Sequence, residues 1–405
     1  MPASQNQSLS LRLLSPGAGQ CKMPRGAGRT NLALASTRSR VIEVDVTRVL
    51  ATLFMVQGHT IDVLLAPQLR QGFFYNGWLF LRGLTAPTFL LLAGMSFTLA
   101  SLKYWDSYLT FSPKFFKRVR RFGIFVLLGY AMHLPVSSFR NLAGLDSAGW
   151  QSWFQVDVLQ CIGGTLIFLQ LLLLLCKTPK RFAQAALGLC VFVVLASPLA
   201  GVIEWRHVMP LSLASYLNFR TGSLFPLFPW SAYILLGAAM GYGVHLWRSG
   251  ASSLRWLLPV GAGLLILAGM ARLPDHLYTQ VDFWTTSPSL FFLRVGCVSL
   301  LLTAVSLVTQ WVPLPGAAVS SLAQESLTIY FIHVSILYGS VWNLGLRQLI
   351  GPTLSGPATL TWIAVMVLSM VMLGLTWHWL KQSKPQTSYL LPSAAALAAI
   401  AYCCV

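Results

Sequence analysis

The stretch from Val44 to Ala66 is apolar and has the length of a membrane-spanning helix, yet it carries Asp45, Arg48, His59 and Asp62. An ionisable side chain inside hydrocarbon costs roughly 2.5 to 3.5 kcal/mol on insertion scales, so such residues normally face the interior of a helix bundle. At about 100° per residue, the four side chains fall on one side of a helix. We therefore predict that Arg48 and His59 face the same interior, about 16 Å apart at a rise of ~1.5 Å per residue.

The composition indicates a membrane protein along the whole chain. Of the 405 residues, 56% are hydrophobic and 9% are charged, and the mean hydropathy is +0.67. A soluble domain has about a quarter of its residues charged. The net charge of +18 comes without a nucleic-acid-binding motif, and a positive-inside bias of the loops explains it. The sequence therefore predicts an all-α, polytopic membrane protein that binds no nucleic acid.

Nine further apolar stretches have about the ~20 residues that a helix needs to cross a bilayer. They are Trp78–Leu102, Phe115–Val136, Phe154–Cys176, Phe182–Ile203, Phe225–Trp247, Trp256–Leu273, Leu290–Val312, Val319–Trp342 and Leu360–Leu380. A final stretch, Leu390–Val405, is shorter and is either an eleventh helix or a re-entrant tail. We predict an all-α integral membrane helix bundle with about 10 to 11 transmembrane helices.

The chain divides into three predicted segments. Residues 1–40 hold six Lys and Arg and no acid, which is typical of a disordered basic tail on anionic lipid, although an organelle transit peptide has a similar composition. Residues 41–382 form the helix bundle, and residues 383–405 form a short apolar C-terminal segment. A cytoplasmic N-terminus places most loop Lys and Arg on the cytoplasmic side, as the positive-inside rule requires. We expect a multi-pass protein of a bacterial inner membrane.

His59 and Asp62 have the spacing of a general base and its partner. A carboxylate three residues further along a helix can hold one ring nitrogen while the other nitrogen stays free to accept a proton. The Asp62 carboxylate would then stabilise the imidazolium that forms. The alternative is a histidine that only bonds the backbone of a neighbouring helix. Arg48 keeps its charge and needs an anion, which is either a bound ligand or Asp45.

Further basic residues are candidates for binding a phosphorylated cofactor. Arg118 and Arg121 belong to a run of four cations within five residues, which attracts phosphates or serves only as a topology signal. Arg82 lies inside the second span, ahead of Pro87, which frees backbone groups and lets another helix or a slim ligand approach. The predicted cofactor-binding residues are Arg48, Arg82, Arg118 and Arg121.

A third group of polar residues is predicted to form the outer wall of the cavity inside the helix bundle. Asp157 and Gln160 open the fourth span. In the ninth span, Tyr330 and His333 lie on one helical face. Trp230 opens the sixth span, where an interfacial anchor is an equally good explanation. The predicted substrate-binding residues are Asp157, Gln160, Trp230, Tyr330 and His333.

The sequence lacks the patterns of several other enzyme classes. It has no HExxH, no CxxC pair, no phosphate-cradling Gly loop and no GxSxG, which weighs against a metalloprotease, an NTPase and a serine hydrolase. The seven cysteines lie mostly in apolar runs without metal spacing, so no metal site is predicted. We interpret the remaining histidines as interfacial, and these are His133, His207, His245, His276 and His378.

Several of these motifs resemble those of the transmembrane acyltransferases. This group contains the acyltransferase-three proteins and the bacterial relatives of the heparan-alpha-glucosaminide N-acetyltransferase catalytic domain. In acyltransferase-three proteins, Arg or Lys is followed after ten residues by His in the first helix, as Arg48 and His59 are here. Asp45 before Arg48 is similar to the Asp-x-x-Arg start of the family, and Arg118 with Arg121 is similar to its Arg-x-x-Arg element.

Other segments look more like the heparan-type branch, and the resemblance runs from about residue 41 to residue 380. The similar segments are Ala86–Gly94, Asp157–Gly163, Phe228–Trp230 and Ser326–His333. Two features depart from the pattern. Ala93-Gly94-Met95 stands where acyltransferase-three proteins have Ser-Gly-Phe, and Asp62 has no counterpart in the family pattern.

The resemblance implies an acyl-CoA-dependent O- or N-acyltransferase. Cytoplasmic acyl-CoA, with acetyl-CoA the expected donor, would place its phosphates on the basic inner residues. Its pantetheine arm would thread the bundle towards His59. The acyl group would pass near the outer face to a hydroxyl or amine of a small-molecule or glycan acceptor, so that the protein modifies glycans if the acceptor is a saccharide.

Two other classes of function remain as alternatives. The intramembrane Asp, Arg and His residues would also suit a proton-coupled secondary transporter, although no inverted repeat is visible. A structural membrane subunit with internal salt bridges is the third hypothesis. The expected partners are the lipid bilayer, acyl-CoA and the acceptor, and a homodimer is left open.

Overall fold

The chain is all-helical in the residues that the structure describes. This computed structural model describes residues 41–248, 257–269, 272, 274–312 and 315–404. Most of these described residues are helical, and no strand occurs among them. The predicted basic tail, residues 1–40, lies outside the described residues, as do parts of the predicted span Trp256–Leu273 and of Leu390–Val405.

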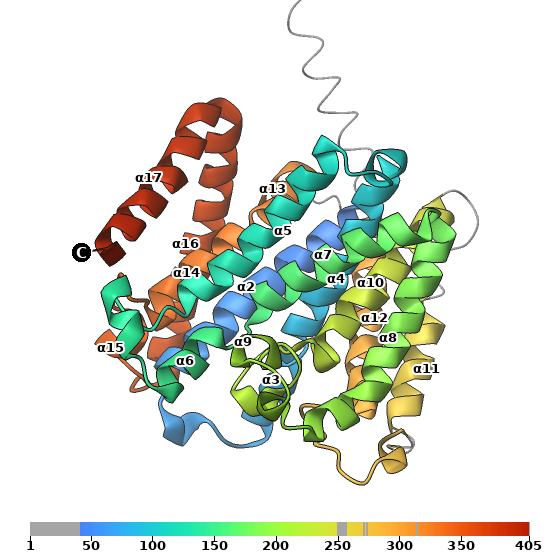
Figure 1. Cartoon of the computed structure of the whole chain (residues 1–405), viewed down its shortest axis with the longest axis horizontal. Coiled ribbons are helices and arrows are strands. Elements are labelled where there is room, and N and C mark those ends of the chain that lie inside the picture. The colour runs from blue at the N-terminus through green and yellow to red at the C-terminus, as the bar shows by residue number, and fades with distance from the viewer. Residues whose placement is uncertain (1–40, 249–256, 270–271, 273, 313–314, 405) are drawn as a thin grey trace, which may run out of the picture. The chain divides into compact units, whose positions relative to one another are not determined.

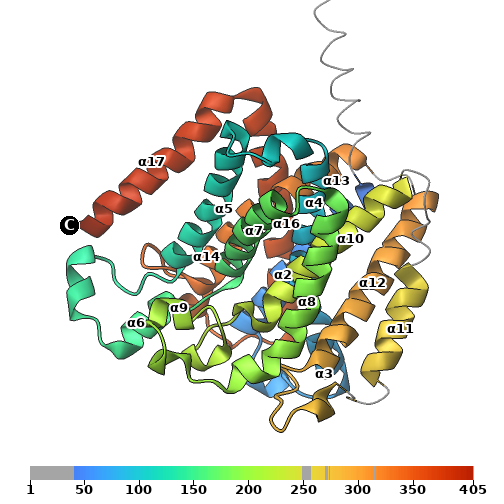
Figure 2. The same cartoon turned by 45° about the vertical axis from the view of Figure 1, so that its right-hand side comes forward.

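The helices are joined by turns and loops, several of which contain a 3₁₀ helix, and are shown in Figures 1 and 2. In chain order they are α2 (Ile42–Leu64), α3 (Phe73–Arg82), α4 (Thr85–Leu102), α5 (Pro113–Met132), α6 (Ser147–Phe154), α7 (Val158–Cys176), α8 (Pro179–Val202), α9 (Leu211–Ala214), α10 (Leu227–Arg248, with a kink at Phe228), α11 (Leu257–Gly269), α12 (Pro288–Trp311), α13 (Gly316–Gln324), α14 (Ser326–Tyr338), α15 (Leu346–Leu349), α16 (Gly356–Ser383) and α17 (Pro385–Cys404).

Local sequence sets where several of these helices begin. Ser112, Thr178 and Ser287 each accept a hydrogen bond from a backbone N–H of the first turn, and a proline follows each of them. A hydroxyl at the N-cap satisfies a backbone donor that the helix cannot, and proline at the first position has no N–H to leave unpaired. Asp157 caps α7 in the same way and is joined there by Gln160 in a capping box.

Two groups of helices pack around separate apolar clusters, and α2 connects them. One cluster draws its buried residues from α4, α5, α7, α8, α10 and α12. The other is smaller and contains Val56 of α2, Ile329 of α14 and Met366 of α16. Because α2 contacts α4 and α12 as well as α13, α14 and α16, it holds a central position between the two groups.

Six helices of the described part are long and apolar enough to cross a membrane. They are Phe73–Leu102, which joins α3 and α4, and then α7, α8, α10, α12 and α16. At 23 residues α2 has the required length, but it carries Glu43, Asp45, Arg48, His59 and Asp62. The 20 residues of α5 include five Lys and Arg. These charges distinguish α2 and α5 from the six apolar helices.

The predicted span Val319–Trp342 contains two helices where one was expected. The first, α13, ends at Gln324, and α14 begins at Ser326, with Glu325 between them at φ −93° and ψ 8°. The Glu325 side chain is buried and accepts hydrogen bonds from Lys381 Nζ (2.6 Å) and Thr328 Oγ1 (3.2 Å). His378 Nδ1 lies 3.3 Å from the same carboxylate. A charge buried beside α16 thus accompanies the break in the helix.

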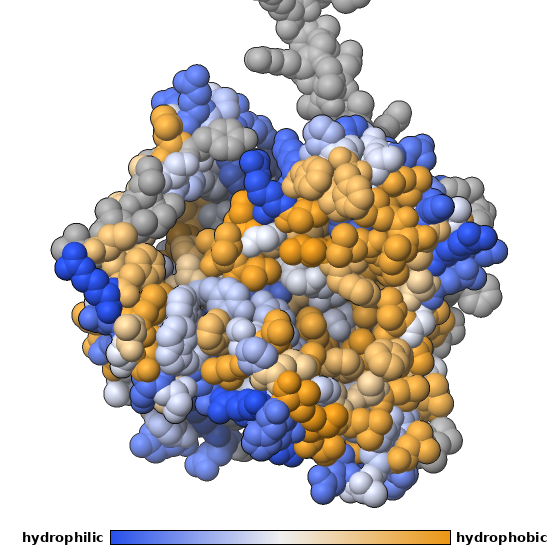
Figure 3. Space-filling model, in the orientation of Figure 1, coloured by the Kyte–Doolittle hydropathy of each residue, from blue (hydrophilic) through white to orange (hydrophobic). Residues whose placement is uncertain are grey.

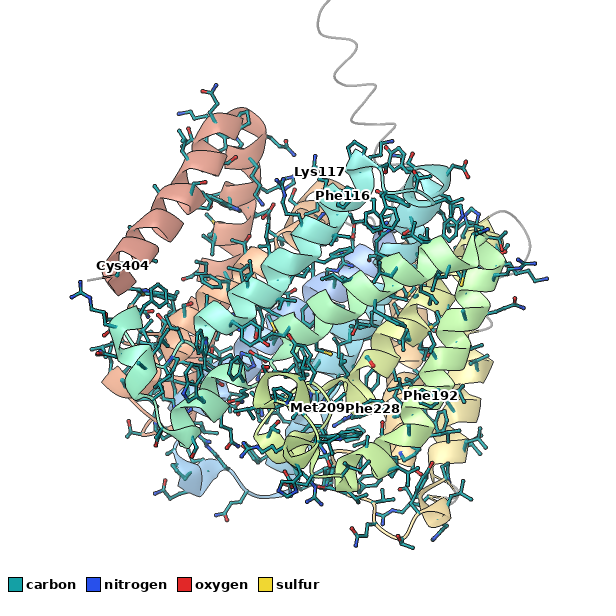
Figure 4. The ribbon with its side chains drawn as sticks, in the orientation of Figure 1. Phe116, Lys117, Phe192, Met209, Phe228 and Cys404 are labelled. Carbon is teal, nitrogen blue, oxygen red and sulfur yellow. The ribbon has the colours of Figure 1, made fainter. Side chains whose placement is uncertain are left out.

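Hydrophobic residues gather over the middle of the face shown in Figure 3, and hydrophilic residues gather towards the ends of the helices. Phe116 and Lys117 lie at the upper edge in Figure 4, at the beginning of α5, and both are exposed. Phe192 of α8 is also exposed and lies on the apolar side. An apolar belt between polar ends matches the two interfaces of a bilayer.

Glycine permits the close approach of α4 and α10, and this contact generates a prediction. A Cβ at Gly94 would overlap the Ile234 carbonyl oxygen, whereas a Cβ at Gly243 of α10 would meet nothing within 4 Å. We expect Gly94→Ala to lower the melting temperature of the detergent-solubilised protein, because the two backbones must separate. Gly243→Ala gains the same helix propensity and should not lower it. Equal melting temperatures for the two variants would show that α4 and α10 do not meet here.

Candidate functional site

His59 of α2 meets His333 of α14 inside the bundle. The two side chains share a hydrogen bond of 3.0 Å between His59 Nδ1 and His333 Nε2. Their rings lie 14° from parallel with centroids 5.2 Å apart. His333 is fully buried, next to the small apolar cluster of α2, α14 and α16. The histidine predicted as the base is therefore paired with a residue predicted to bind substrate.

The backbone of α14 determines which nitrogens of this pair carry hydrogen. His333 Nδ1 lies 2.7 Å from the Ile329 carbonyl oxygen. A carbonyl only accepts, so Nδ1 of His333 must be the donor, and in a neutral ring Nε2 is then an acceptor. His59 must therefore donate through Nδ1 to His333. In a neutral His59 this leaves Nε2 unprotonated, with a lone pair that can accept a proton.

A second polar group lies beside the histidine pair. The Tyr330 hydroxyl donates to Asp157 Oδ2 (3.0 Å), and the Tyr330 ring packs edge-on against His333 with centroids 5.8 Å apart. His133 Nε2 lies 3.4 Å from the same carboxylate oxygen. Asp157 Oδ1 accepts from the backbone N–H of Val158. The structure therefore brings together three of the predicted residues, Asp157, Tyr330 and His333, at the beginning of α7.

Asp62 pairs with Arg82 in place of His59. The Arg82 guanidinium and the Asp62 carboxylate form a close ion pair, and the two side chains are 30% and 21% exposed. Arg70 donates to the backbone carbonyl of Asp62 (2.9 Å). The expected contact of Asp62 with a nitrogen of His59 is thus replaced by an ion pair between α2 and α3, while His333 takes the position beside His59.

The ionisable residues of α2 contact different neighbours. Asp45 accepts from Ser320 of α13 (2.9 Å), and Arg48 donates to Ser96 and to the Leu92 carbonyl of α4. Arg48 Nη1 also lies 3.9 Å from Asp45. At about 100° per residue, the four predicted positions spread over an arc of about 100°. That arc is wide enough for a central helix to direct them at several surrounding helices.

The two arginines of α5 are placed differently. Arg118 donates to Ser101 Oγ (2.8 Å) and to the Phe97 carbonyl (2.9 Å), and its guanidinium lies 4.1 Å from the centre of the Phe97 ring. Arg121 is exposed. The two guanidinium groups do not point to the same place, because Arg118 is directed at α4 and Arg121 at the surface.

Gln160 and Trp230 have structural contacts that account for their positions. The Gln160 amide accepts from the backbone N–H of Asp157 (3.1 Å) and donates to the Gln155 carbonyl (3.4 Å). Trp230 packs in an aromatic cluster with Phe225 at 4.7 Å, as measured between ring centroids. The substrate-binding role of these two residues stays a prediction.

Sequence reasoning missed two residues that border the histidine pair. We interpreted His133 as interfacial, but it contacts Asp157. Tyr338, at the last position of α14, meets the His59 ring edge-on with centroids 5.7 Å apart. Tyr338 lies eight residues after Tyr330 on the same short helix, about 80° further round it, and this spacing was the available signal. In the part of the chain that the structure describes, no three His, Cys, Asp or Glu residues gather as a metal site.

The ion pair between α2 and α3 generates a prediction for a double-mutant cycle. Asp62→Asn and Arg82→Gln each leave one charge without its partner, whereas the double variant removes both charges. We expect the double variant to lose less stability than the sum of the two single losses. The difference, which is the coupling free energy of the pair, should be about 0.5 to 3 kcal/mol in thermal unfolding. The exposed pair of Glu204 and Arg220 is the control and should couple weakly. Additive effects at Asp62 and Arg82 would contradict the pairing.

Comparison with known proteins identifies the family of this chain. A family model described as heparan-alpha-glucosaminide N-acetyltransferase, catalytic, matches residues 40–281, which is more than half of the chain and includes α2 to α11 and the loop after it. A comparison with curated proteins gave no match. With its apolar helices, the chain is a multi-pass membrane protein with a transferase-type domain. The chain belongs to the family of the heparan-alpha-glucosaminide N-acetyltransferase catalytic domain.

Proposed function

We propose that this protein transfers an acyl group, with acetyl as the expected case, from acyl-CoA to a hydroxyl or amine of an acceptor, and that His59 is the general base. The observation that supports this most strongly is the hydrogen-bond chain from His59 through His333 to the Ile329 carbonyl. It leaves Nε2 as the acceptor nitrogen of His59. The family match supports the reaction class, because the family is named for acetyl transfer.

The proposed step balances without a metal or an oxidant. Nε2 of His59 accepts the proton of the acceptor hydroxyl or amine while the acceptor atom attacks the thioester carbonyl carbon. The tetrahedral intermediate expels the CoA thiolate, which takes the proton back from the imidazolium. An ester or amide and free CoA thiol result. His333 orients His59 by accepting its Nδ1–H, and it takes the orienting role that we had predicted for Asp62.

Arg82 is proposed to stabilise the negative charge of the tetrahedral intermediate. Its side chain passes close to Gly58, the residue before His59, because a Cβ added at Gly58 would lie 3.2 Å from Arg82 Nε. Asp62 holds the guanidinium by the ion pair described above. Preorganised donors aimed at a developing oxyanion are among the largest contributions to acyl transfer. In this proposal Asp62 acts through Arg82, and so Asp62 is a positioning residue.

The basic beginning of α5 is proposed to bind the phosphates of CoA. Arg121 is exposed near Lys117 and Arg120, and guanidinium groups suit phosphate oxygens. Arg118 donates a hydrogen bond to Ser101 of α4 and so holds α5 against α4 next to these residues. Arg48 lies further along the route to His59. This proposal assumes a cytoplasmic N-terminus, so that acyl-CoA arrives from the cytoplasm and transfer takes place near the outer face.

The number of crossings and the segment boundaries are also part of the proposal. We propose that α2, α5, α11 and the pair α13 and α14 cross the membrane together with the six apolar helices, which gives about 10 crossings, and that α17 is an eleventh. The segments then remain residues 1–40, 41–382 and 383–405. The surrounding membrane is proposed to be a bacterial inner membrane, and a homodimer is compatible with this arrangement.

The general-base role of His59 generates the main activity prediction. Purified protein in nanodiscs is incubated with radiolabelled acetyl-CoA and a mixture of sugars and amino sugars, and labelled product is counted. We expect His59→Ala to reduce transfer by about 10² to 10⁴-fold, the usual contribution of a general base. Binding of acetyl-CoA should stay within a few-fold of the unchanged protein, because the phosphates are held elsewhere.

The matched control is His207→Ala, which replaces an exposed histidine of a loop. It should transfer acetyl at the unchanged rate. A fully active His59→Ala variant would remove the proposed base. Failure of the unchanged protein to bind acetyl-CoA, together with proton-coupled uptake of a solute in liposomes, would favour the transporter alternative.

A further inference from the structure

Arg294 is a charged residue inside one of the six apolar helices. It is the only Lys, Arg, Asp or Glu of α12, and it lies six residues after Pro288, about 9 Å along the axis at ~1.5 Å per residue. A charged side chain is costly within a membrane helix, so it usually faces the bundle interior and binds a partner there. Arg294 has no part in the proposed acyl transfer and lies beyond the residues 40–281 that the family model matches.

The register of α12 directs Arg294 into the bundle. A Cβ at Gly296 would lie 2.7 Å from the Leu265 side chain, so Gly296 marks the side of α12 that packs on α11. At about 100° per residue, Arg294 points about 160° away from that side. Figure 2 shows α11 at the edge of the bundle, next to α12. The Arg294 guanidinium accordingly lies against α10, at 5.4 Å from the centre of the Trp230 ring.

No carboxylate pairs with Arg294. None of the ten Asp and Glu residues of the chain, all of which the structure describes, forms an ion pair with it. The described helices α4, α8, α10, α11 and α12 contain no Asp or Glu. Asp275, just before α12, accepts from the Ser287 hydroxyl instead. At the end of α2, Asp62 is paired with Arg82.

Trp230 adds a second hydrogen-bond donor at the same place. The residue is 9% exposed, and its Nε1 atom is buried without a hydrogen-bond partner in the part of the chain that the structure describes. Ring contacts with Phe225 and Tyr233, at 4.7 and 5.7 Å between centroids, hold the indole and leave its N–H unused. The Tyr233 hydroxyl lies beside Arg294, but it is neutral and does not balance the charge. A buried donor without an acceptor costs free energy that a bound acceptor would recover.

We infer that Arg294 and Trp230 form a site for a single oxyanion group, a carboxylate or a phosphate ester, where α10 and α12 meet. The guanidinium offers paired N–H donors to two oxygens of such a group, and the indole offers a third donor. Neither side chain accepts a hydrogen bond, so the pair selects a ligand that supplies negative oxygen atoms. The oxyanion belongs either to an acidic solute or to the headgroup of an anionic lipid. The inference does not depend on the proposed function.

The test observes the Trp230 indole by ¹⁹F NMR. The full chain is labelled with 5-fluorotryptophan and purified in dodecyl maltoside, which carries no charge and no phosphate, and Trp230→Phe identifies the Trp230 signal. Benzoate, methyl phosphate and phosphatidylglycerol are titrated separately, and benzamide is the neutral counterpart of benzoate. We expect at least one of the anions, and not benzamide, to shift the Trp230 signal saturably. The signal of Trp311, which is 84% exposed at the other end of α12, should not move.

Variants separate the site from general effects of anions. Arg294→Met keeps a long side chain and removes the charge, so the dissociation constant of the anion should rise at least tenfold. Arg206→Met, which removes an exposed arginine of a loop, should leave it unchanged. Trp230→Phe keeps an aromatic ring and removes the N–H. The anion should therefore raise the melting temperature of this variant less than that of the unchanged protein at the same concentration.

The titrant that binds identifies the source of the oxyanion. Saturable shifts with benzoate or methyl phosphate would support a site for an acidic solute, and a shift with phosphatidylglycerol alone would support a site for a lipid headgroup. A shift of the same affinity in Arg294→Met, or with benzamide, would overturn the inference. The absence of a saturable shift with all three anions would overturn it as well, because Arg294 would then only stack on Trp230.

Discussion

The hydrogen bond between His59 and His333 joins the two parts of the chain that carry the chemistry. It connects α2 to α14 across 274 positions of sequence, at a distance of 3.0 Å. His333 is held by its own helix, because its Nδ1 donates to the Ile329 carbonyl one turn earlier. The Ile329 carbonyl thus determines the tautomer of His333, and His333 in turn determines the tautomer of His59. The proposed base depends on this chain of hydrogen bonds, because it leaves Nε2 of His59 without a proton.

The fold keeps this hydrogen bond in place from both sides. On one side, α2 is packed among α4, α12, α13, α14 and α16. On the other side, α14 begins at the break around Glu325, where Lys381 and His378 of α16 contact the buried carboxylate. A buried charge that loses one of its partners is strongly destabilising. The Glu325 contacts therefore fix the beginning of the short helix that carries Tyr330, His333 and Tyr338.

The sequence was sufficient for the class of fold. Hydropathy predicted a helical membrane protein, and the four ionisable residues of the first helix predicted that this helix faces the interior of the bundle, where α2 contacts α4, α12, α13, α14 and α16. Spacing within one helix correctly placed Tyr330 and His333 together, because both positions depend only on the geometry of α14. The predicted spans at Phe115, Phe182 and Leu290 correspond to α5, α8 and α12, which begin two or three residues earlier, where serine or threonine is followed by proline.

Pairing between distant helices was beyond the reach of the sequence. Asp62 was predicted to contact His59, but the structure pairs it with Arg82. Periodicity gives the side of a helix on which a residue lies, and does not give the helix that packs there. The same limit explains why His133 was interpreted as interfacial and why Val319–Trp342 was predicted as one continuous helix. Its break lies at Glu325, which contacts His378 and Lys381 of α16, more than 50 residues further along the chain.

The most direct test of this account is the protonation of the two ring nitrogens of His59. Protein labelled with ¹⁵N on histidine is reconstituted in lipid at neutral pH and measured by solid-state NMR, with a His59→Gln sample to assign the His59 signals. The account predicts a protonated Nδ1 that is coupled to His333 through the hydrogen bond, and an unprotonated Nε2. A His59 ring that carries its proton on Nε2 and has a bare Nδ1 would contradict it, because the nitrogen proposed as the base would already be occupied.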